Sequence, residues 1–243
     1  MRPHYTQRLS SVFIALSFLF ISQNAFALGS KRPSTGGGTT TPTTPKPPVV
    51  VQPPVVKPEV PVDNGSETIA EKYSYVDQDK IVPAALLIKT LTYYDANKSK
   101  IKNKNYIIVI DFKQHNSKKR FYLINMQSGD VEQYLTAHGK NSDSDYDGYS
   151  TKYSNTSGSL MSSLGFYLTA ETYNGENGYS LRLDGLSSTN SNARSRAIVI
   201  HGASYVKPGS KIGRSYGCPA LEVRYAADVI DTIKGGSLIY ADG

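Results

Sequence analysis

The sequence predicts a mostly β domain with a few peripheral helices. Three observations predict this class: many short β-branched runs, turn-rich joins between them, and only two segments with helical periodicity. The globular part spans residues 66–243, which is long enough for one domain with a hydrophobic core. We find no internal repeat and no second linker within it.

The two predicted helices lie near the two ends of this globular part. Pro83 suits a first helical turn, and apolar residues from Ala84 to Tyr94 recur at helical spacing. We expect this apolar stripe to pack in the core. The second predicted helix covers residues 226–234 and ends at a Gly-Gly pair, which is a common helix stop.

Short predicted strands account for most of the remaining chain. Each is enriched in β-branched or aromatic residues and is bounded by polar or glycine-containing turns. Their ranges are 106–112, 120–125, 131–137, 165–171, 179–183, 197–200 and 237–240. Strands this short, joined by turns, favour a sheet-based domain over a helical bundle.

The N-terminal 27 residues have the features of a secretory signal peptide. Arg2 and Arg8 precede an apolar run over residues 12–21, and Ala25 and Ala27 provide small residues at the usual cleavage offsets. The run is too short to span a bilayer, which needs ~20 residues, so an uncleaved anchor is the weaker alternative. We therefore expect an exported protein, periplasmic or cell-wall-associated, with no membrane span after cleavage.

Residues 28–65 have the composition of a linker. They contain nine of the thirteen prolines, a run of three glycines and many threonines. Such a segment cannot bury enough apolar surface to offset the entropy lost on ordering it. Two interpretations stay open, a spacer that gives reach into a cell wall and an inert tether.

The charge of the chain argues against a nucleic-acid-binding function. Without Arg2 and Arg8 of the signal peptide, 25 of the 27 basic side chains remain against 20 acidic ones, a net charge of +5. This excess is spread along the chain and does not form a dense basic stripe. It favours an anionic polymer such as a bacterial wall, although ordinary solubility explains it equally well.

The chain contains a single cysteine, Cys218, and a histidine, His201, at the end of a β-branched run. In an exported protein a lone cysteine is a reactive thiol or half of an intermolecular bridge. A thiol and an imidazole are the two parts of a cysteine acyltransferase, since the thiolate attacks a carbonyl and the imidazole carries the proton. Gly217 permits a tight turn that aims its own N–H and that of Cys218 at a developing oxyanion. The structural alternative is a pair of buried core residues.

Three further residues are candidates for substrate binding. Arg214 is a candidate carboxylate clamp, because guanidinium groups bind carboxylates in bidentate fashion. Ser215 is placed to bond within the cysteine loop or to a substrate. His138 also precedes a glycine, and it is a candidate to line the same cleft, to act as a second base, or to bond to the backbone.

The sequence predicts no metal site. Residues 143–148 match the first half of a calcium-binding loop, but Ser154 occupies the position where a bidentate Glu is expected. We therefore expect a solvated acidic loop. The histidines of the globular part lie too far apart in sequence to form a zinc site by spacing, and His115 stands in a polar loop that suggests a solvated side chain.

The residues around the histidine and the cysteine form a recognisable signature. It reads His-Gly-x, then about a dozen residues, then Ser-x-Gly-Cys, here at residues 201–203 and 215–218. On these motifs the chain resembles the L,D-transpeptidase (YkuD-type) catalytic domain, in the subgroup of murein L,D-transpeptidase catalytic domain proteins. Four other segments resemble this subgroup: 162–166, 170–173, 183–186 and 193–197.

The resemblance covers about residues 80–240 and departs from the better-studied branch after the cysteine. That branch has an apolar residue and an arginine there, whereas this chain has Pro219 and Ala220. Arg214 is the nearest residue able to replace that arginine. The departure bears on how substrate is held more than on the type of reaction.

The resemblance implies the sandwich-like fold of L,D-transpeptidases and action on peptidoglycan, with no metal or organic cofactor. Cys218 would attack the carbonyl of the third stem-peptide residue, a diaminopimelate, and release D-alanine. His201 would be the base, with a backbone carbonyl holding its second nitrogen. An amine would then take the thioester, or water would, which would make the protein an L,D-carboxypeptidase. A wall-binding module that keeps the fold without catalysis is an alternative of another class, and we expect a monomer.

Overall fold

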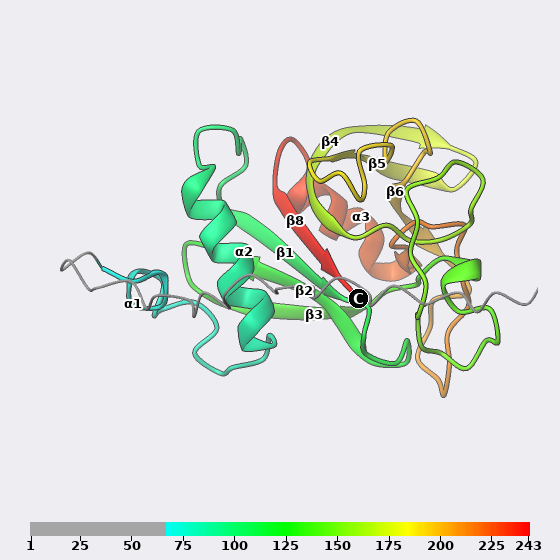
Figure 1. Ribbon diagram of the computed structural model, residues 1–243, viewed down its shortest axis with the longest axis horizontal. Coiled ribbons are helices and arrows are strands. Elements are labelled where there is room, and N and C mark those ends of the chain that lie inside the picture. The colour runs from blue at the N-terminus through cyan, green and yellow to red at the C-terminus, as the bar shows by residue number, and fades with distance from the viewer. Residues whose placement is uncertain (1–66) are drawn as a thin grey trace, which may run out of the picture. The chain divides into compact units, whose positions relative to one another are not determined.

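The computed structural model describes residues 67–243, whose backbone is shown in Figure 1. The predicted signal peptide, residues 1–27, and the predicted linker, residues 28–65, lie outside the described residues. Within residues 67–243, no helix combines the length and the apolar character that crossing a membrane requires.

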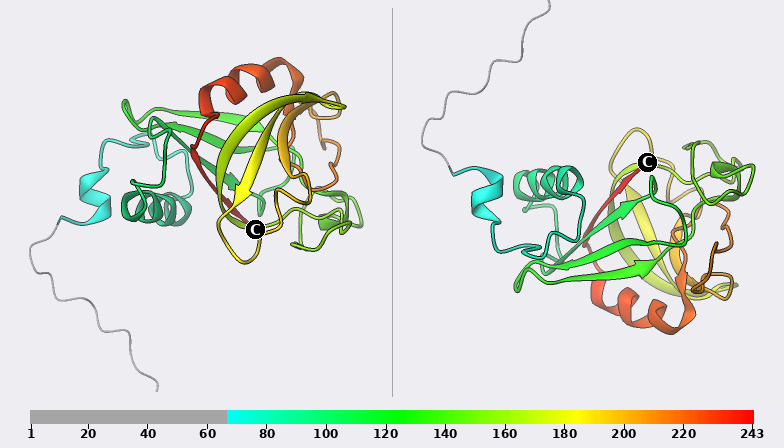
Figure 2. Two further views of the ribbon diagram at one scale, coloured as in Figure 1. Left: turned by 90° about the horizontal axis from the view of Figure 1, so that it is seen from above. Right: turned by 90° about the horizontal axis from the view of Figure 1, so that it is seen from below.

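One eight-stranded sheet is the framework of the domain (Figures 1 and 2). In spatial order its strands are β3 (Val131–Leu135), β2 (Lys119–Asn125), β1 (Tyr106–Asp111), β8 (Leu238–Asp242), β4 (Gly165–Gly175), β5 (Gly178–Gly185), β6 (Val199–Ala203) and β7 (Leu221–Glu222). The pairs β1–β8 and β6–β7 are parallel, and the other neighbours are antiparallel. The predicted mostly β class is confirmed.

The described helices are few. They are α1 (Ile69–Lys72), α2 (Ala84–Ala96) and α3 (Val223–Ile233), with a 3-10 turn η1 (Lys140–Ser142). Two of the helices, α2 and α3, lie against this sheet, whereas α1 contacts α2. Helix α2 packs beside β1 and β8, whereas α3 packs mainly on β6 (Figure 2). Helix α3 therefore covers the strand that carries His201.

Strand β1 separates two hydrophobic cores. Ile107 and Val109 pack in the core that includes residues of α2, whereas Ile108 and Ile110 pack in the core that includes residues of α3. Successive side chains of a strand point to opposite faces, so covering both faces buries every one of these residues. This explains why the segment reads as an unbroken apolar run rather than as an alternating one.

The predicted elements are present, with differences at their ends. Pro83 is the N-cap residue of α2 rather than a residue of its first turn, and α3 begins at Val223, before the predicted start. The very short α1 and β7 were not predicted. Strand β6 continues to Ala203 because Gly202 pairs with Leu221 of β7. His201 therefore lies inside a strand and not after its end.

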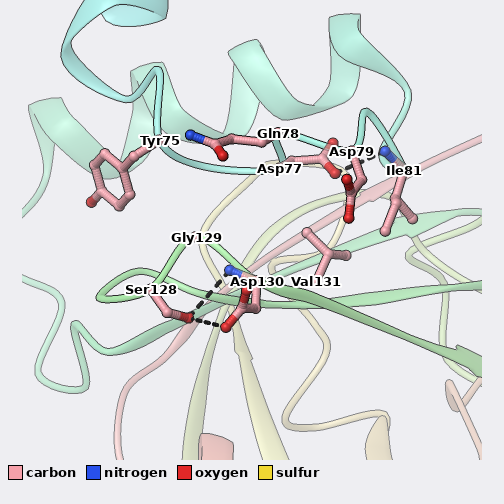
Figure 3. A pocket seen from close by; sticks show the side chains of 9 residues that line it. All are labelled: Tyr75, Asp77, Gln78, Asp79, Ile81, Ser128, Gly129, Asp130 and Val131. Atoms are coloured by element: carbon pink, nitrogen blue, oxygen red, sulfur yellow. Dashed lines mark hydrogen bonds between the residues drawn. The ribbon is translucent and has the colours of Figure 1, made fainter.

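A pocket of about 200 Å³ lies between the segment that precedes α2 and the turn between β2 and β3 (Figure 3). Two of its three acidic side chains have partners in the protein. The Asp77 carboxylate accepts the N–H groups of Ile81 and Val82, and Asp130 accepts from the Ser128 hydroxyl. None of the residues that line this pocket belongs to the segments carrying His201 or Cys218.

Candidate active site

Cys218 stands in a tight turn just before β7. Gly217 has a φ of +126°, and a Cβ added there would lie 2.8 Å from the Met161 carbonyl oxygen and 2.9 Å from Ile198 Cδ1. The Ser215 hydroxyl closes the turn, since it donates to the Cys218 carbonyl oxygen at 2.7 Å and accepts the Gly217 N–H at 3.1 Å. Backbone angle and close packing both require glycine before the cysteine.

The internal bond of Gly217 changes the oxyanion site that we expected. Its N–H points to the Ser215 hydroxyl, whereas we expected it to face a developing oxyanion. Among residues 67–243, the N–H groups of Tyr216 and Cys218 have no acceptor. The N–H of Cys218, on the nucleophile candidate itself, therefore remains available to donate to an oxyanion.

His201 is the third residue of β6, and only 4% of its surface is exposed. Its Nδ1 lies 3.0 Å from the Gly202 carbonyl oxygen. A carbonyl only accepts, so Nδ1 carries the proton and Nε2 keeps its lone pair. Burial lowers the pKa of His201, and the bond to Gly202 opposes that shift in part. The imidazole is therefore neutral near pH 7, the form in which it can accept a proton.

The strand pairing brings the thiol beside the strand of the histidine. Gly202 pairs in parallel with Leu221, so stepping back along both segments sets Val199 alongside Cys218. In agreement, Cys218 Sγ lies 3.6 Å from the carbonyl oxygen of Ala197, just before β6. Val199 and His201 lie two residues apart and share one face of the strand. The pairing therefore places the cysteine turn alongside the strand that carries His201, and Sγ itself contacts the carbonyl oxygen of Ala197.

The half-buried Cys218 thiol has opposing influences on its pKa. Burial raises the pKa, whereas the Val199 backbone and the positive charge of Arg196 lower it, and the net direction is upward. A thiol with a raised pKa carries little thiolate near neutral pH, so it needs a base. This requirement fits the neutral His201.

Arg196 is a residue of the site that the sequence analysis did not separate from other arginines. Its guanidinium donates to the carbonyl oxygens of Ser154 and Met161, both at 2.6 Å. It is also close to the cysteine turn, since a Cβ added at Gly217 would lie 3.5 Å from Arg196 Nη2. The only local signal was its position directly before the strand that carries His201.

His138 is fully buried, although we considered it as a residue lining the cleft. Its Nδ1 lies 2.9 Å from Arg120 Nη2, and its Nε2 lies 3.1 Å from Asp143 Oδ2. The guanidinium only donates and the carboxylate accepts, so Nδ1 is the acceptor and Nε2–H the donor. Burial, followed by the charge of Arg120, lowers the pKa of His138 to about 3. Neither ring nitrogen is free to contact a substrate.

The two other predicted substrate-binding residues also have partners inside the protein. Arg214 donates to the carbonyl oxygens of Lys140 and Asp143, and its guanidinium lies 4.1 Å from the centre of the Tyr146 ring. Ser215 bonds within the cysteine turn. Tyr216, which we did not single out, is 72% exposed directly beside that turn. Its aromatic ring between Ser215 and Gly217 was the available signal.

The acidic loop over residues 143–148 divides into buried and exposed parts. Asp143, Asp145 and Asp147 place one oxygen each within 4.8 Å of one another. However, Asp143 is buried, and its carboxylate already accepts from His138 and from the N–H groups of Asp147 and Gly148. The expectation of a solvated loop is thus confirmed for Asp145 and Asp147 and wrong for Asp143.

A thiol, a neutral imidazole and a main-chain donor thus lie on neighbouring segments of a β-rich fold. Residues 78–241, more than half of the chain, match the family described as the L,D-transpeptidase catalytic domain. The chain belongs to this family. No curated protein matches the chain.

Solved structures of several bacterial proteins are similar to this chain at low identity. L,D-transpeptidase 1 of Mycobacterium tuberculosis has 15% identity and a TM-score of 0.33, with 57% of this chain and 62% of that chain covered. An L,D-transpeptidase of Mycobacterium smegmatis has 14% identity and a TM-score of 0.36, with 57% and 59% covered. The helical cell shape determining protein of Campylobacter jejuni has 15% identity and a TM-score of 0.36, with 56% and 47% covered. The chain spans less than two thirds of the length of these proteins.

Proposed function

We propose that this protein is a cysteine acyltransferase that acts on peptidoglycan stem peptides, with Cys218 as nucleophile and His201 as general base. Membership of the L,D-transpeptidase catalytic domain family supports the substrate class. The observation that carries the proposal is the bond from His201 Nδ1 to the Gly202 carbonyl. It leaves Nε2 as a proton acceptor on the strand that runs beside the cysteine turn.

The reaction follows from these roles. His201 Nε2 takes the thiol proton, and the thiolate attacks the carbonyl carbon of the third stem residue, a diaminopimelate. The N–H of Cys218 stabilises the negative oxygen of the tetrahedral intermediate. The bond to D-alanine then breaks, the imidazolium returns its proton to the leaving amine, and a thioester remains on Cys218. An amine acceptor attacks this thioester, forms a new amide and restores the thiol.

The features outside the described residues complete this proposal. An exported chain, periplasmic or associated with the wall, meets the stem tetrapeptide donor and the amine acceptor in the compartment where they occur. The linker over residues 28–65 then acts as a spacer that gives the catalytic domain reach into the wall. Tyr216 offers an exposed ring beside the cysteine turn that a substrate could contact.

The direct test is incubation with a disaccharide tetrapeptide, followed by intact-protein mass and product analysis. We expect a covalent adduct on Cys218, release of D-alanine and a cross-linked dimer. The matched control is Cys218→Ala, which should give neither adduct nor D-alanine. A tripeptide as sole product would identify water as the acceptor and make the protein an L,D-carboxypeptidase. Binding to sacculi without any D-alanine release would contradict catalysis and favour a wall-binding module.

A further inference from the structure

Three polar side chains form a buried row that the proposed reaction does not use. Arg120, His138 and Asp143 each have no exposed surface. Arg120 Nη2 donates to His138 Nδ1 at 2.9 Å, and His138 Nε2 donates to Asp143 Oδ2 at 3.1 Å. A neutral imidazole therefore joins a buried positive charge to a buried negative charge.

Arg120 enters the interior because β2 contains a bulge at this position. The pairing with β3 shifts between Lys119, opposite Leu135, and Phe121, opposite Tyr134. Arg120 is the extra residue on β2, and a bulge of this kind re-aims a side chain. The guanidinium donates to the carbonyl oxygen of Thr136 as well as to His138.

All members of this row have partners, so the row specifies one arrangement. Arg120 also donates to the carbonyl oxygens of Phe112 and Gln114, and Asp143 accepts the N–H groups of Asp147 and Gly148. Buried charges are costly to bring out of water, and they are retained where every hydrogen-bonding group is satisfied. Removing the middle member would leave both ends short of a partner.

The main chain beside His138 is bonded directly to the residue that closes the cysteine turn. The N–H of Ser215 donates to the His138 carbonyl oxygen at 2.9 Å, and the N–H of Lys140 donates to the Ser215 carbonyl oxygen at 2.7 Å. Ser215 in turn holds the Cys218 carbonyl and the Gly217 N–H. The position of the nucleophile thus depends on the segment that His138 anchors.

A second set of bonds connects the same two segments through Ser162. Its hydroxyl accepts the N–H of Gly139 at 3.0 Å and donates to the Gly217 carbonyl oxygen at 3.4 Å. Its N–H donates to the Ser142 hydroxyl at 3.0 Å. The cysteine turn is therefore held from two sides by residues 138–142.

We propose that His138 is a positioning residue: by joining Arg120 to Asp143, it fixes residues 138–143 and, through Ser215, the turn that presents Cys218. The consequence for catalysis rests on the proposed function, whereas the consequence for the turn does not. His138 acts through its neighbours and touches no reacting atom.

Two substitutions of His138 separate the contacts of its two nitrogens. His138→Gln can keep an N–H donor near Asp143, since its amide reaches the distance of Nε2. His138→Asn places its amide at the distance of Nδ1, so it can accept from Arg120 but loses Asp143. We expect His138→Asn to speed amide exchange in residues 213–221 about tenfold and to lower kcat by a similar factor with little change in KM. In His138→Gln, both the amide exchange of residues 213–221 and kcat should stay much closer to their native values.

The measurement combines hydrogen exchange by mass spectrometry with the alkylation rate of Cys218 from pH 5 to 9. A peptide from β5, residues 178–185, is the internal control, because a general loss of stability would speed its exchange as well. His115→Gln is the matched variant, since His115 contacts the carbonyl oxygen of Asp147 in the same loop but not Asp143. It should leave the exchange of residues 213–221 and the alkylation of Cys218 unchanged.

The outcomes decide the proposal without any substrate. Unchanged exchange of residues 213–221 in His138→Asn, or an equal increase in the β5 peptide, would overturn it. If that variant does not fold, Asp143→Asn, which removes the charge from the other end of the row, provides the same local comparison. If exchange and alkylation change as expected while the native protein releases no D-alanine, the positioning role stands and the proposed function fails.

Discussion

The two buried histidines of this domain look alike in sequence and differ in their partners. His138 and His201 both follow or lie in a strand, both precede a glycine, and burial lowers the pKa of both. His201 has one backbone partner and keeps its Nε2 without a partner among the described residues, whereas His138 has a charged partner at each nitrogen. Burial therefore does not distinguish the two histidines, whereas a ring nitrogen without a protein partner does, and this is the feature on which the proposed base role of His201 rests.

The largest expected effect comes from removing the Cys218 thiol, from which His201 is proposed to take the proton. Cys218→Ala and Cys218→Ser should fold normally and lose at least about 10³-fold in turnover, as expected when a nucleophile is removed. The measurement is D-alanine release from a soluble tetrapeptide, with thermal unfolding as the check on folding. Turnover retained by Cys218→Ala would remove the basis for distinguishing the two histidines.

Exchanging the histidines for glutamine tests the comparison directly. His201→Gln should lower turnover by ~10²–10⁴ and slow alkylation of Cys218 near neutral pH, because the proton acceptor is gone. His138→Gln should keep turnover much closer to the native value. Both variants are compared by tetrapeptide turnover and by alkylation from pH 5 to 9. If His138→Gln abolishes both while His201→Gln spares them, the two roles are reversed.

A smaller effect concerns acid stability and sharpens the contrast. The pKa of His138 is about 3 in the folded protein, whereas an unfolded histidine titrates near its ordinary value of 6.5. Between these values only the unfolded chain binds the proton, so protonation favours unfolding. The stability that neutral His138 contributes is complete above about pH 6.5 and is lost as the pH falls. The free energy of unfolding should fall by about 1 kcal/mol for each pH unit below this. The free energy of unfolding, measured by urea unfolding at pH 7, 5 and 4, should depend less steeply on pH in His138→Gln than in the native protein. Equal dependence on pH in the two proteins would argue against a neutral His138.

The smallest expected effect comes from removing the segment that precedes the catalytic domain. The composition of residues 28–65 predicts no packed contact with the catalytic domain. A chain that starts at Ser66 should match the longer protein in turnover on soluble substrate and in thermal midpoint. A marked drop in midpoint would show that the segment contributes to the folded domain after all.

Much of the fold could be predicted from local patterns. The unbroken apolar run of β1 and the helical periodicity of α2 each identify an element without reference to the rest of the chain. The very short α1 and β7 carry too few residues for such a pattern. Strand β6 was predicted too short because the partner that extends it, Leu221, is distant in sequence.

The candidate site could be predicted only where its chemistry is local. The lone Cys218 and the His-Gly and Gly-Cys pairs can be read directly from the sequence. The burial of His138 cannot, because Arg120 reaches it only through the bulge in β2 and the pairing with β3. Likewise, nothing local indicates that the Ser215 hydroxyl takes up the Gly217 N–H.

The position of β8 has a consequence for the order in which this domain can be assembled during synthesis. This strand, the last in chain order, lies between β1 and β4, which do not pair with each other. A growing chain that lacks Leu238–Asp242 leaves an unpaired edge on each of these two strands. His201 and the segment of His138 come from opposite sides of that gap. Until β8 is added, pairing between the two groups of strands is limited to their other edges, where Thr136 pairs with Leu221 and Gly139 pairs with Ser215 beside the cysteine turn.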